Sequence, residues 1–348
     1  MNELFLKAIA KKPIPRTPIW MMRQAGRYLP EYRAAREKAG SFLQLCKTPE
    51  LACEVTLQPI RRFGFDAAIL FSDILTIPDA MNLGLTFAEG EGPRFSKKLE
   101  TAADIMNLSI PDPEVELRYV PDTIRLLKKE LTVPLIGFAG SPWTIASYML
   151  EGQAPGEFKK AKGLLYQNPK LMHHLLYTLA QSITLYLRAQ IEAGVDTVML
   201  FDSWGGALTE SAYHEFSFNY MQEIITQLKA HHPKTPVILF TKGSGAWLEL
   251  LNTSPADVIG LDWQTSLSRA RNILGQKHAL QGNLDPAILR ADESVIEAEV
   301  KKVLHAYGPG SGHIFNLGHG ITPDIHPEKV AFLVQCVKTQ SHDIMTSS

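Results

Sequence analysis

Two arginines sit in a segment that suits recognition of an anionic ligand. Arg23 and Arg27 flank Gly26 and precede a proline, a composition that disfavours a continuous helix. A guanidinium group binds a carboxylate or a phosphate through parallel hydrogen bonds, so converging arginines favour a ligand with several acidic groups. Because Arg33 and Arg36 follow closely, the competing interpretation is a solvated helix face.

Other candidate side chains come after apolar runs or close to them. Asp73 follows the run 65–71, and its carboxylate either accepts hydrogen bonds from a ligand or caps nearby backbone N–H groups. Ser203 and His319 also follow apolar runs, where a helix cap and an ordinary loop histidine are the competing interpretations. Tyr148 is either a ligand donor or a half-buried tyrosine with a local partner.

Eight short apolar runs position these groups. Stretches with helical periodicity and helix punctuation separate most of them, and strands that are apolar on both faces indicate a parallel sheet buried on both sides. This alternation predicts a single-domain (β/α)8 TIM-type barrel with its active site at the C-terminal ends of the strands. A doubly wound open sheet is the alternative, because periodicity does not report closure. The runs are 18–22, 65–71, 134–138, 197–201, 237–240, 258–261, 278–280 and 313–317.

Helix signals and the chain end complete the expected organisation. Pro49 opens a helix that ends near Arg62, and Pro169 opens a longer one that Gly194 stops. No linker divides the chain, so we expect one barrel domain over 1–340. The polar residues 341–348 are expected to form a flexible C-terminal tail.

Composition narrows the function classes. The chain has 348 residues, of which 45% are hydrophobic, as in a globular protein with a large core. Lys and Arg total 35 against 36 Asp and Glu, so no net field favours a nucleic acid or an anionic membrane. Cys46, Cys53 and Cys336 lack the close spacing of a zinc or redox site, which favours a reducing, cytoplasmic location and predicts no metal.

Several motifs together resemble one known family. The segments 18–33 (PIWMMRQAGRYLPEYR) and 137–152 (GFAGSPWTIASYMLEG) are similar to two signature sequences of the uroporphyrinogen decarboxylase family. Shorter similar segments are FSDIL at 71–75, FDSW at 201–204 and GHG at 318–320, and their order and spacing span nearly the whole chain.

The resemblance implies a homodimeric, cofactor-free barrel enzyme of haem and tetrapyrrole biosynthesis. Such an enzyme is a carboxy-lyase that removes four acetate carboxyl groups from uroporphyrinogen (III), releases CO2 and leaves coproporphyrinogen (III). Its substrate carries eight carboxylates around a ring with four inward pyrrole N–H donors. The residues implied in substrate binding are Arg23, Gln24, Ala25, Gly26, Arg27, Asp73, Tyr148, Ser203 and His319. Asp73 and Arg23 are also the implied catalytic residues.

The implied chemistry explains why no cofactor is expected. Protonation of a pyrrole carbon makes the ring cationic, and the cation is the electron sink that a decarboxylation needs. An ionised Asp73 near this cation stabilises it. The proton donor is left open among Arg23, His319, Tyr148, a carboxyl group and water.

Two other functions are weighed against this one. Related methyltransferases use a His-X-Cys pair and a distant cysteine to hold zinc, but Gln44, Leu51 and Val334 stand two residues before the three cysteines. A catalytically silent tetrapyrrole-binding protein is the second alternative. A serine hydrolase is disfavoured because no glycine stands two residues before Ser203.

Overall fold

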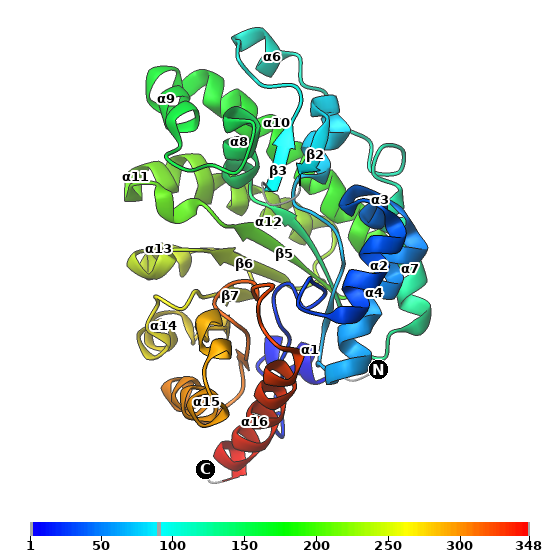
Figure 1. The fold of residues 1–348 in the computed structure, drawn as a ribbon. Helices are drawn as coiled ribbons and strands as arrows, with labels where there is room; N and C mark the ends of the chain where they lie inside the picture. Colours follow the sequence, from blue (N-terminus) through cyan, green and yellow to red (C-terminus); the bar gives the residue numbers. More distant parts are fainter. Residues whose placement is uncertain (1–2, 89–91, 347–348) are drawn as a thin grey trace.

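The computed structural model describes residues 3–88 and 92–346 (Figure 1). Its helices are α1 (Leu4–Ile9), α2 (Pro30–Ala39), α3 (Phe42–Lys47), α4 (Pro49–Phe63), α5 (Thr76–Pro78), α6 (Ala102–Met106), α7 (Tyr119–Glu130), α8 (Pro142–Glu151), α9 (Lys159–Gln167), α10 (Pro169–Ala193), α11 (Glu210–Tyr213), α12 (Asn219–His231), α13 (Leu248–Leu251), α14 (Leu267–Leu274), α15 (Glu293–Tyr307) and α16 (Pro327–Thr346). Its strands are β1 (Ala68–Ile69), β2 (Leu85–Ala88), β3 (Gly92–Phe95), β4 (Leu135–Gly140), β5 (Thr197–Asp202), β6 (Val237–Thr241), β7 (Val258–Gly260), β8 (Ala279–Gln281) and β9 (His313–Ile314). The 3-10 and π segments are η1 (Asp79–Leu83), η2 (Gly205–Ala207), η3 (His214–Phe218), η4 (Ser244–Ala246) and η5 (Pro286–Arg290).

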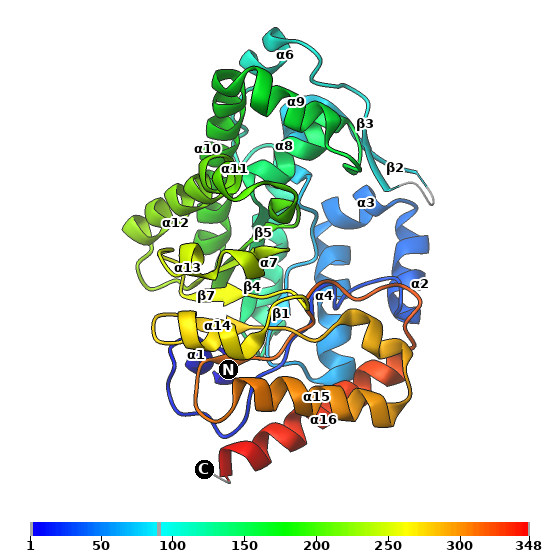
Figure 2. The same ribbon diagram turned by 90° about the vertical axis from the view of Figure 1, so that its left-hand side faces the viewer.

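Seven parallel strands form the central sheet, in the order β1-β4-β5-β6-β7-β8-β9. Helices surround the curled sheet, and α10 runs along its outside next to α8 and α12 (Figures 1 and 2). The strands are almost entirely buried, as the continuous apolar runs predict. The single-domain parallel α/β architecture with TIM-barrel character is therefore confirmed, and seven of the eight predicted runs contain a sheet strand.

The eighth predicted run, 18–22, joins the two edges of the sheet. Ile19 forms a parallel bridge with Phe315, next to β9, and its carbonyl accepts the N–H of Asp66, just before β1, at 2.8 Å. The Asp66 carboxylate in turn accepts the Ile19 N–H at 2.9 Å. It also forms a bidentate ion pair with the Arg16 guanidinium. The run therefore connects the two edges through backbone hydrogen bonds on both sides, supported by the partly buried ion pair of Asp66 with Arg16.

Helix ends follow the sequence signals. Pro49 begins α4, and Gly64 ends it in the left-handed conformation. The Asn168 side chain accepts the N–H of Leu171 at the start of α10, and Gly194 ends that helix. These two helices confirm the predicted boundaries to within a residue.

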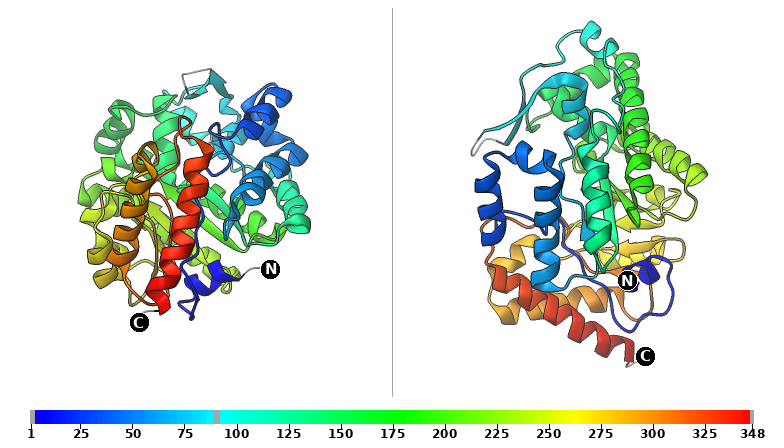
Figure 3. Two further views of the ribbon diagram at one scale, coloured as in Figure 1. Left: turned by 60° about the horizontal axis from the view of Figure 1, so that its bottom comes forward. Right: turned by 90° about the vertical axis from the view of Figure 1, so that its right-hand side faces the viewer.

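Two features differ from expectation. The antiparallel hairpin β2–β3 was not predicted; it lies beside α8, where the Phe95 N–H donates to Gly152 (Figure 2). The predicted tail begins too early, because α16 continues to Thr346 and packs against α15 and α4 (Figure 3). Ser341 is buried there and its hydroxyl accepts the N–H of Thr17 at 3.2 Å. Residues 347–348 of that tail lie outside the described residues.

Within the described ranges, no helix is both long and apolar enough to cross a membrane.

Candidate active site

The predicted site residues come from five places around one end of the sheet. Arg23 follows the bridged Ile19 segment, Asp73 follows β1, and Tyr148 lies on α8 after β4. Ser203 directly follows β5, and His319 comes after β9. Because parallel strands end at the same edge, this topology gathers the five groups at the carboxyl end of the barrel.

Arg23 is held in an unusual backbone conformation at this edge. Its φ is +62°, which is uncommon for a residue with a side chain. The side chain lies over Gly320, where an added Cβ would stand 2.4 Å from the Arg23 Cδ. Glycine at 320 thus leaves the space that the arginine fills. Among the described residues, the exposed guanidinium has no hydrogen bond or ion pair, so it is available to a ligand.

The rest of the arginine loop divides into structural and available groups. Gln24 is fully buried, its amide contacts Met21 N and Ala67 O, and its own N–H donates to Met21. The Gln24 side chain therefore anchors the loop to the residue before β1, and its contact with a ligand stays a prediction. The Ala25 and Gly26 N–H groups have no acceptor within the described part of the chain, so they remain candidates for a carboxylate.

Arg27 also projects from this loop. Its side chain is exposed and forms no ion pair within the described ranges. Arg33 has a different position, because its guanidinium donates to the carbonyls of Arg27 and Tyr28 at 2.8 and 3.3 Å. Arg33 therefore supports the loop, and Arg27 is left free to bind an anion.

Asp73 is half-buried at the end of the β1 run. One carboxylate oxygen accepts the Leu75 N–H at 2.8 Å, and the Asp73 carbonyl accepts the Thr76 hydroxyl at 3.1 Å. Burial raises the pKa of Asp73, and the Leu75 N–H and the positive charge of Arg23 oppose that rise. The geometry is compatible with both interpretations of Asp73, as a backbone cap and as a ligand acceptor. One carboxylate oxygen caps a turn, and the other has no hydrogen bond within the described residues.

Tyr148 and Ser203 occupy neighbouring junctions. The Tyr148 ring lies 6.3 Å from the Trp204 ring, burial raises the Tyr148 pKa, and the charges of Asp73 and Arg23 act on it in opposite directions. The Ser203 side chain is half-buried and forms no hydrogen bond within the described ranges. Both hydroxyl groups are placed to serve as hydrogen-bond donors to a ligand.

A buried carboxylate organises these two junctions. Asp202 is fully buried and accepts the hydroxyls of Ser141, Thr144 and Ser217 at 2.7–2.8 Å. Ser141 is also the N-cap of α8, the helix that carries Tyr148. Asp202 consequently ties the start of α8 to the end of β5, one residue before Ser203.

His319 lies within the electrostatic influence of Arg23 and Lys242. Its ring lies 6.1 Å from the ring of Phe240. Burial, together with the positive charges of Arg23 and Lys242, lowers the pKa of His319 to about 3. The imidazole is therefore neutral at neutral pH, able to donate one hydrogen bond and accept another.

Sequence reasoning missed Lys242 and Asp262. Lys242 directly follows β6, and its ammonium lies 5.4 Å from the centre of the Trp263 ring. Asp262 is fully buried, where its carboxylate accepts the Gly243 N–H and the Thr265 hydroxyl. Their position after an apolar run is the same signal that selected Asp73, but no recognised motif surrounds them.

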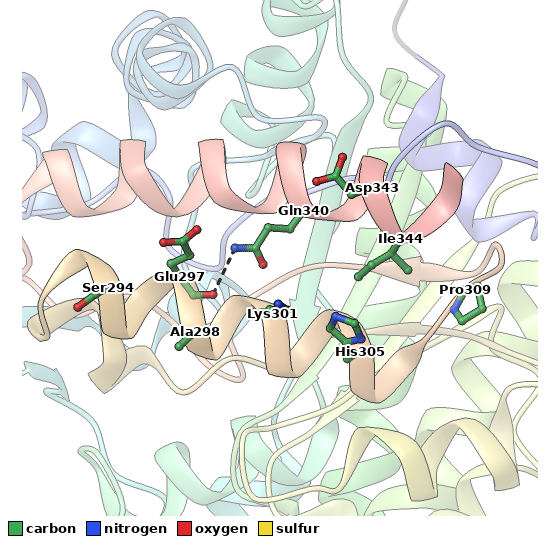
Figure 4. A pocket seen from close by; sticks show the side chains of 9 residues that line it. All are labelled: Ser294, Glu297, Ala298, Lys301, His305, Pro309, Gln340, Asp343 and Ile344. Carbon is green, nitrogen blue, oxygen red and sulfur yellow. Dashed lines mark hydrogen bonds between the residues drawn. The ribbon is translucent and has the colours of Figure 1, made fainter. Parts of the chain in front are cut away.

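The cavity between α15 and α16 belongs to a different region (Figure 4). It has a volume of about 690 Å³, and a hydrogen bond of 3.4 Å from Gln340 Nε2 to the Glu297 carbonyl crosses it. Lys301 and His305 line one side and Asp343 the other. None of the predicted site residues contributes to it.

Comparisons with known proteins cover nearly the whole chain. Residues 1–340 match the family described as Uroporphyrinogen decarboxylase (URO-D). The uroporphyrinogen decarboxylase of Thioalkalivibrio sulfidiphilus is 58% identical over 96% of both chains. That of Tolumonas auensis is 57% identical over 97% of this chain and 96% of its own. This chain belongs to the uroporphyrinogen decarboxylase family.

The barrel of this uroporphyrinogen decarboxylase family member also resembles solved structures of other activity. A methyltransferase from Methanosarcina mazei superposes with a TM-score of 0.82 at 18% identity, covering 97% of this chain and 98% of its own. A B12-independent methionine synthase from Shewanella sp. W3-18-1 has a TM-score of 0.57 at 11% identity, covering 85% and 87%. At such identities the likeness concerns the fold alone.

The soft-ligand set of a zinc methyltransferase has no counterpart in the described part of this decarboxylase family chain. The three cysteines are free and buried, and no cluster of three or more His, Cys, Asp or Glu side chains there is arranged to hold a metal ion.

Proposed function

We propose that this protein is a uroporphyrinogen decarboxylase that converts uroporphyrinogen III to coproporphyrinogen III and four CO2. The observation that carries the proposal is a half-buried Asp73 within the electrostatic influence of an unpaired Arg23 at the carboxyl end of the barrel, in a chain of this family. An anion with an available arginine near it suits a ligand with acidic groups outside and N–H donors inside.

The substrate is recognised at two radii. Arg23 and Arg27 bind carboxylates at the rim, with the N–H groups of Ala25 and Gly26 and the neutral imidazole of His319 as further partners. The free oxygen of Asp73 accepts the pyrrole N–H groups at the centre. Tyr148 and Ser203 donate hydroxyl hydrogen bonds to carboxylates between these positions.

The chemistry needs only the substrate and the protein. Protonation of a ring carbon beside the acetate makes that pyrrole cationic. The C–CO2 bond then breaks, and its electron pair neutralises the ring and leaves an exocyclic CH2 group. A proton adds to this CH2 carbon to give the methyl group, and the ring carbon releases the proton that it first took up, so one proton is consumed for each CO2 released. At about 4 Å and an effective dielectric near 20, the Asp73 anion contributes about 4 kcal/mol of gross attraction to that cation.

The titration directions narrow the choice of proton donor. His319 holds no transferable proton at neutral pH, because its pKa is lowered to about 3. Burial raises the Tyr148 pKa and makes this phenol a weaker acid. We therefore assign the proton to water or to a carboxyl group of the substrate. Arg23 is assigned as a catalytic residue that binds the departing carboxylate next to this proton source.

Two properties of the whole protein belong to this proposal. We propose that the protein is a homodimer, as its resemblance to the family implies. We also propose that it is located in the cytoplasm. Three free, buried thiols suit a reducing compartment. Light scattering after size exclusion measures the dimer directly.

The deciding experiment is anaerobic turnover of uroporphyrinogen III, followed by chromatography of the products. Products with seven, six, five and four carboxyl groups are expected in sequence. Dialysis against a chelator is expected to leave the rate unchanged, because the pyrrole itself serves as the electron sink. Binding without turnover would identify a silent tetrapyrrole-binding protein, and activity restored only by zinc would contradict the cofactor-free reaction.

A further inference from the structure

Lys242 is a cation at the same edge that the proposed reaction has not used. It directly follows β6, the strand whose last residue, Thr241, pairs with Asp202 at the end of β5. The side chain is half-buried, and its ammonium lies 5.4 Å from the centre of the Trp263 ring. An aromatic face attracts a cation but does not neutralise its charge.

The backbone of Lys242 is fixed from both sides. Its N–H donates to the Asp202 carbonyl at 3.1 Å, and its carbonyl accepts the Gly206 N–H at 2.9 Å. The next residue, Gly243, donates its N–H to the Asp262 carboxylate on the β7 side. A Cβ added to Gly206 would lie 2.5 Å from the Lys242 carbonyl oxygen, so this close approach requires glycine. The lysine thus projects from a rigid junction.

No anion compensates this lysine within the described ranges. Asp262, the acid on the adjacent strand end, is already occupied by the Gly243 N–H, the Gln264 N–H and the Thr265 hydroxyl. The ammonium forms no ion pair, and the group that senses its charge is His319, which Arg23 also approaches. Arg23 and Lys242 are thus two positive charges near a neutral imidazole, and this uncompensated charge favours the binding of a ligand anion.

We infer that Lys242 binds one carboxylate of the substrate, jointly with the neutral imidazole of His319 and against the Trp263 wall. The inference rests on the proposed function, because it takes the anion to be one of the porphyrinogen carboxylates. It places an anion-binding group on the β6 side of the barrel. The cations considered so far, Arg23 and Arg27, come from the loop beside β1.

The test compares Lys242→Gln with a matched control, Lys234→Gln. Lys234 is exposed and precedes the same strand at its other end, so both variants lose one charge. For Lys242→Gln we expect KM for uroporphyrinogen III to rise about tenfold or more, with kcat within about threefold of wild type. Lys234→Gln is expected to match wild type. Lys242→Arg restores the cation and is expected to recover KM to within about threefold.

Binding is measured separately by quenching of tryptophan fluorescence with uroporphyrin I, the oxidised octacarboxylate, which requires no turnover. A dissociation constant raised about tenfold in Lys242→Gln supports the assignment even if wild-type protein fails to decarboxylate, an outcome that would contradict only the proposed function. Unchanged KM and unchanged binding in a folded Lys242→Gln overturn it, as does an equal defect in Lys242→Arg. If the Gln variant does not fold, Lys242→Met, which retains the apolar stem against Trp263, replaces it.

Discussion

Opposing influences act on the charge of Asp73. In the free site, burial disfavours its anion and raises its pKa, whereas the Leu75 N–H and Arg23 favour the anion. In the reaction that we propose, a cationic pyrrole gives the anion a partner and therefore lowers that pKa.

Substitution at Asp73 separates the catalytic from the capping interpretation. Asp73→Asn removes the charge and adds an NH2 group that opposes the pyrrole donors, so single-turnover decarboxylation is expected to be severely slowed. Asp73→Glu keeps the charge but shifts it by one methylene, which costs about a hundredfold where geometry governs the step. We expect Asn to be the more damaged of the two.

Circular dichroism and thermal melting serve as the controls for both Asp73 variants. An Asn variant that is folded and turns over within threefold of wild type would show that Asp73 only caps the turn at Leu75.

The pH dependence of kcat/KM follows from the same charges. Activity needs the Asp73 anion, and burial raises its pKa, so activity is lost as pH falls through a value above that of an ordinary aspartate. Arg23 lowers the Asp73 pKa. Arg23→Gln is therefore expected to move this acid limb to higher pH, in addition to lowering kcat/KM.

The matched control for the acid limb is Arg27→Gln, because Arg27 is not among the groups that act on the Asp73 pKa. Arg27→Gln is expected to lower kcat/KM by an amount equivalent to about 1.5 to 3 kcal/mol of transition-state stabilisation. The acid limb of its pH profile is expected to stay at the wild-type position. An unmoved limb in Arg23→Gln would contradict the assignment of the limb to Asp73.

At the scale of elements, two strands on either side of β6 end in a similar construction. Asp202 at the end of β5 and Asp262 after β7 are fully buried, and each accepts hydrogen bonds from the end of the preceding strand's segment as well as from residues that follow it. The residue beside each aspartate, Ser203 or Trp263, is one to which we assign a role toward the ligand. The buried hydrogen bonds of the two aspartates fix the backbone at these positions.

Loss of the Asp202 carboxylate is expected to be costly. Asp202→Ala leaves three buried hydroxyl donors without their acceptor, at about 1 to 3 kcal/mol each, so the free energy of unfolding is expected to fall by about 3 kcal/mol or more. Asp202→Asn keeps one acceptor oxygen and should lose less. Urea unfolding gives both values, and the exposed Asp292→Asn is the control, expected within about 0.5 kcal/mol. Equal stability of Asp202→Ala and wild type would show that water replaces the carboxylate.

Periodicity located the strands because burial on both faces imposes a continuous apolar run. It did not identify Ile19 as a bridge instead of a strand, since the Ile19 N–H bonds to the carboxylate of Asp66, a charged residue within the apolar run 65–71, and side-chain contacts of this kind leave no periodic signal. The β2–β3 hairpin was missed because its strands are short and lie outside the central sheet, where alternation is weak. The early end predicted for α16 reflects polar composition, whereas Ser341 is buried by a contact from the other end of the chain.

The candidate site was predictable where a motif surrounded a residue and not elsewhere. The arginine loop and Asp73 were found in this way, and the structure gathers them at one edge. The sequence position of Gln24 between two arginines does not reveal that its side-chain amide is buried and holds the loop in place. No motif surrounds Lys242, and only its contact with Trp263 and the effect of its charge on the His319 pKa single it out.

At the scale of the whole molecule, the ion pair of Arg16 and Asp66 holds the carboxylate that accepts the Ile19 N–H where the two edges of the sheet meet. The Asp66 side chain is 2% exposed and the Arg16 side chain 22%, and removing one partner of such a pair costs up to about 3 to 5 kcal/mol. Asp66→Asn is therefore expected to lower stability in guanidinium by this amount and to speed hydrogen exchange at Ile19. The exposed pair of Lys302 with Glu299 is the comparison: Lys302→Gln should change stability by less than about 0.5 kcal/mol. Slow exchange at Ile19 in Asp66→Asn would show that the bridge to Phe315 is sufficient.

The bridge of Ile19 with Phe315 also governs when the protein is able to finish folding during synthesis. Ile19 leaves the ribosome long before Phe315, its bridge partner, which directly follows the last strand of the sheet. Until that strand emerges, both margins of the growing sheet expose unpaired backbone groups, which are sites for association between nascent chains. A polypeptide that ends before β9 is therefore expected to be an aggregation-prone fragment instead of a smaller stable protein. The two unpaired sheet edges are where we expect a chaperone to bind the growing chain.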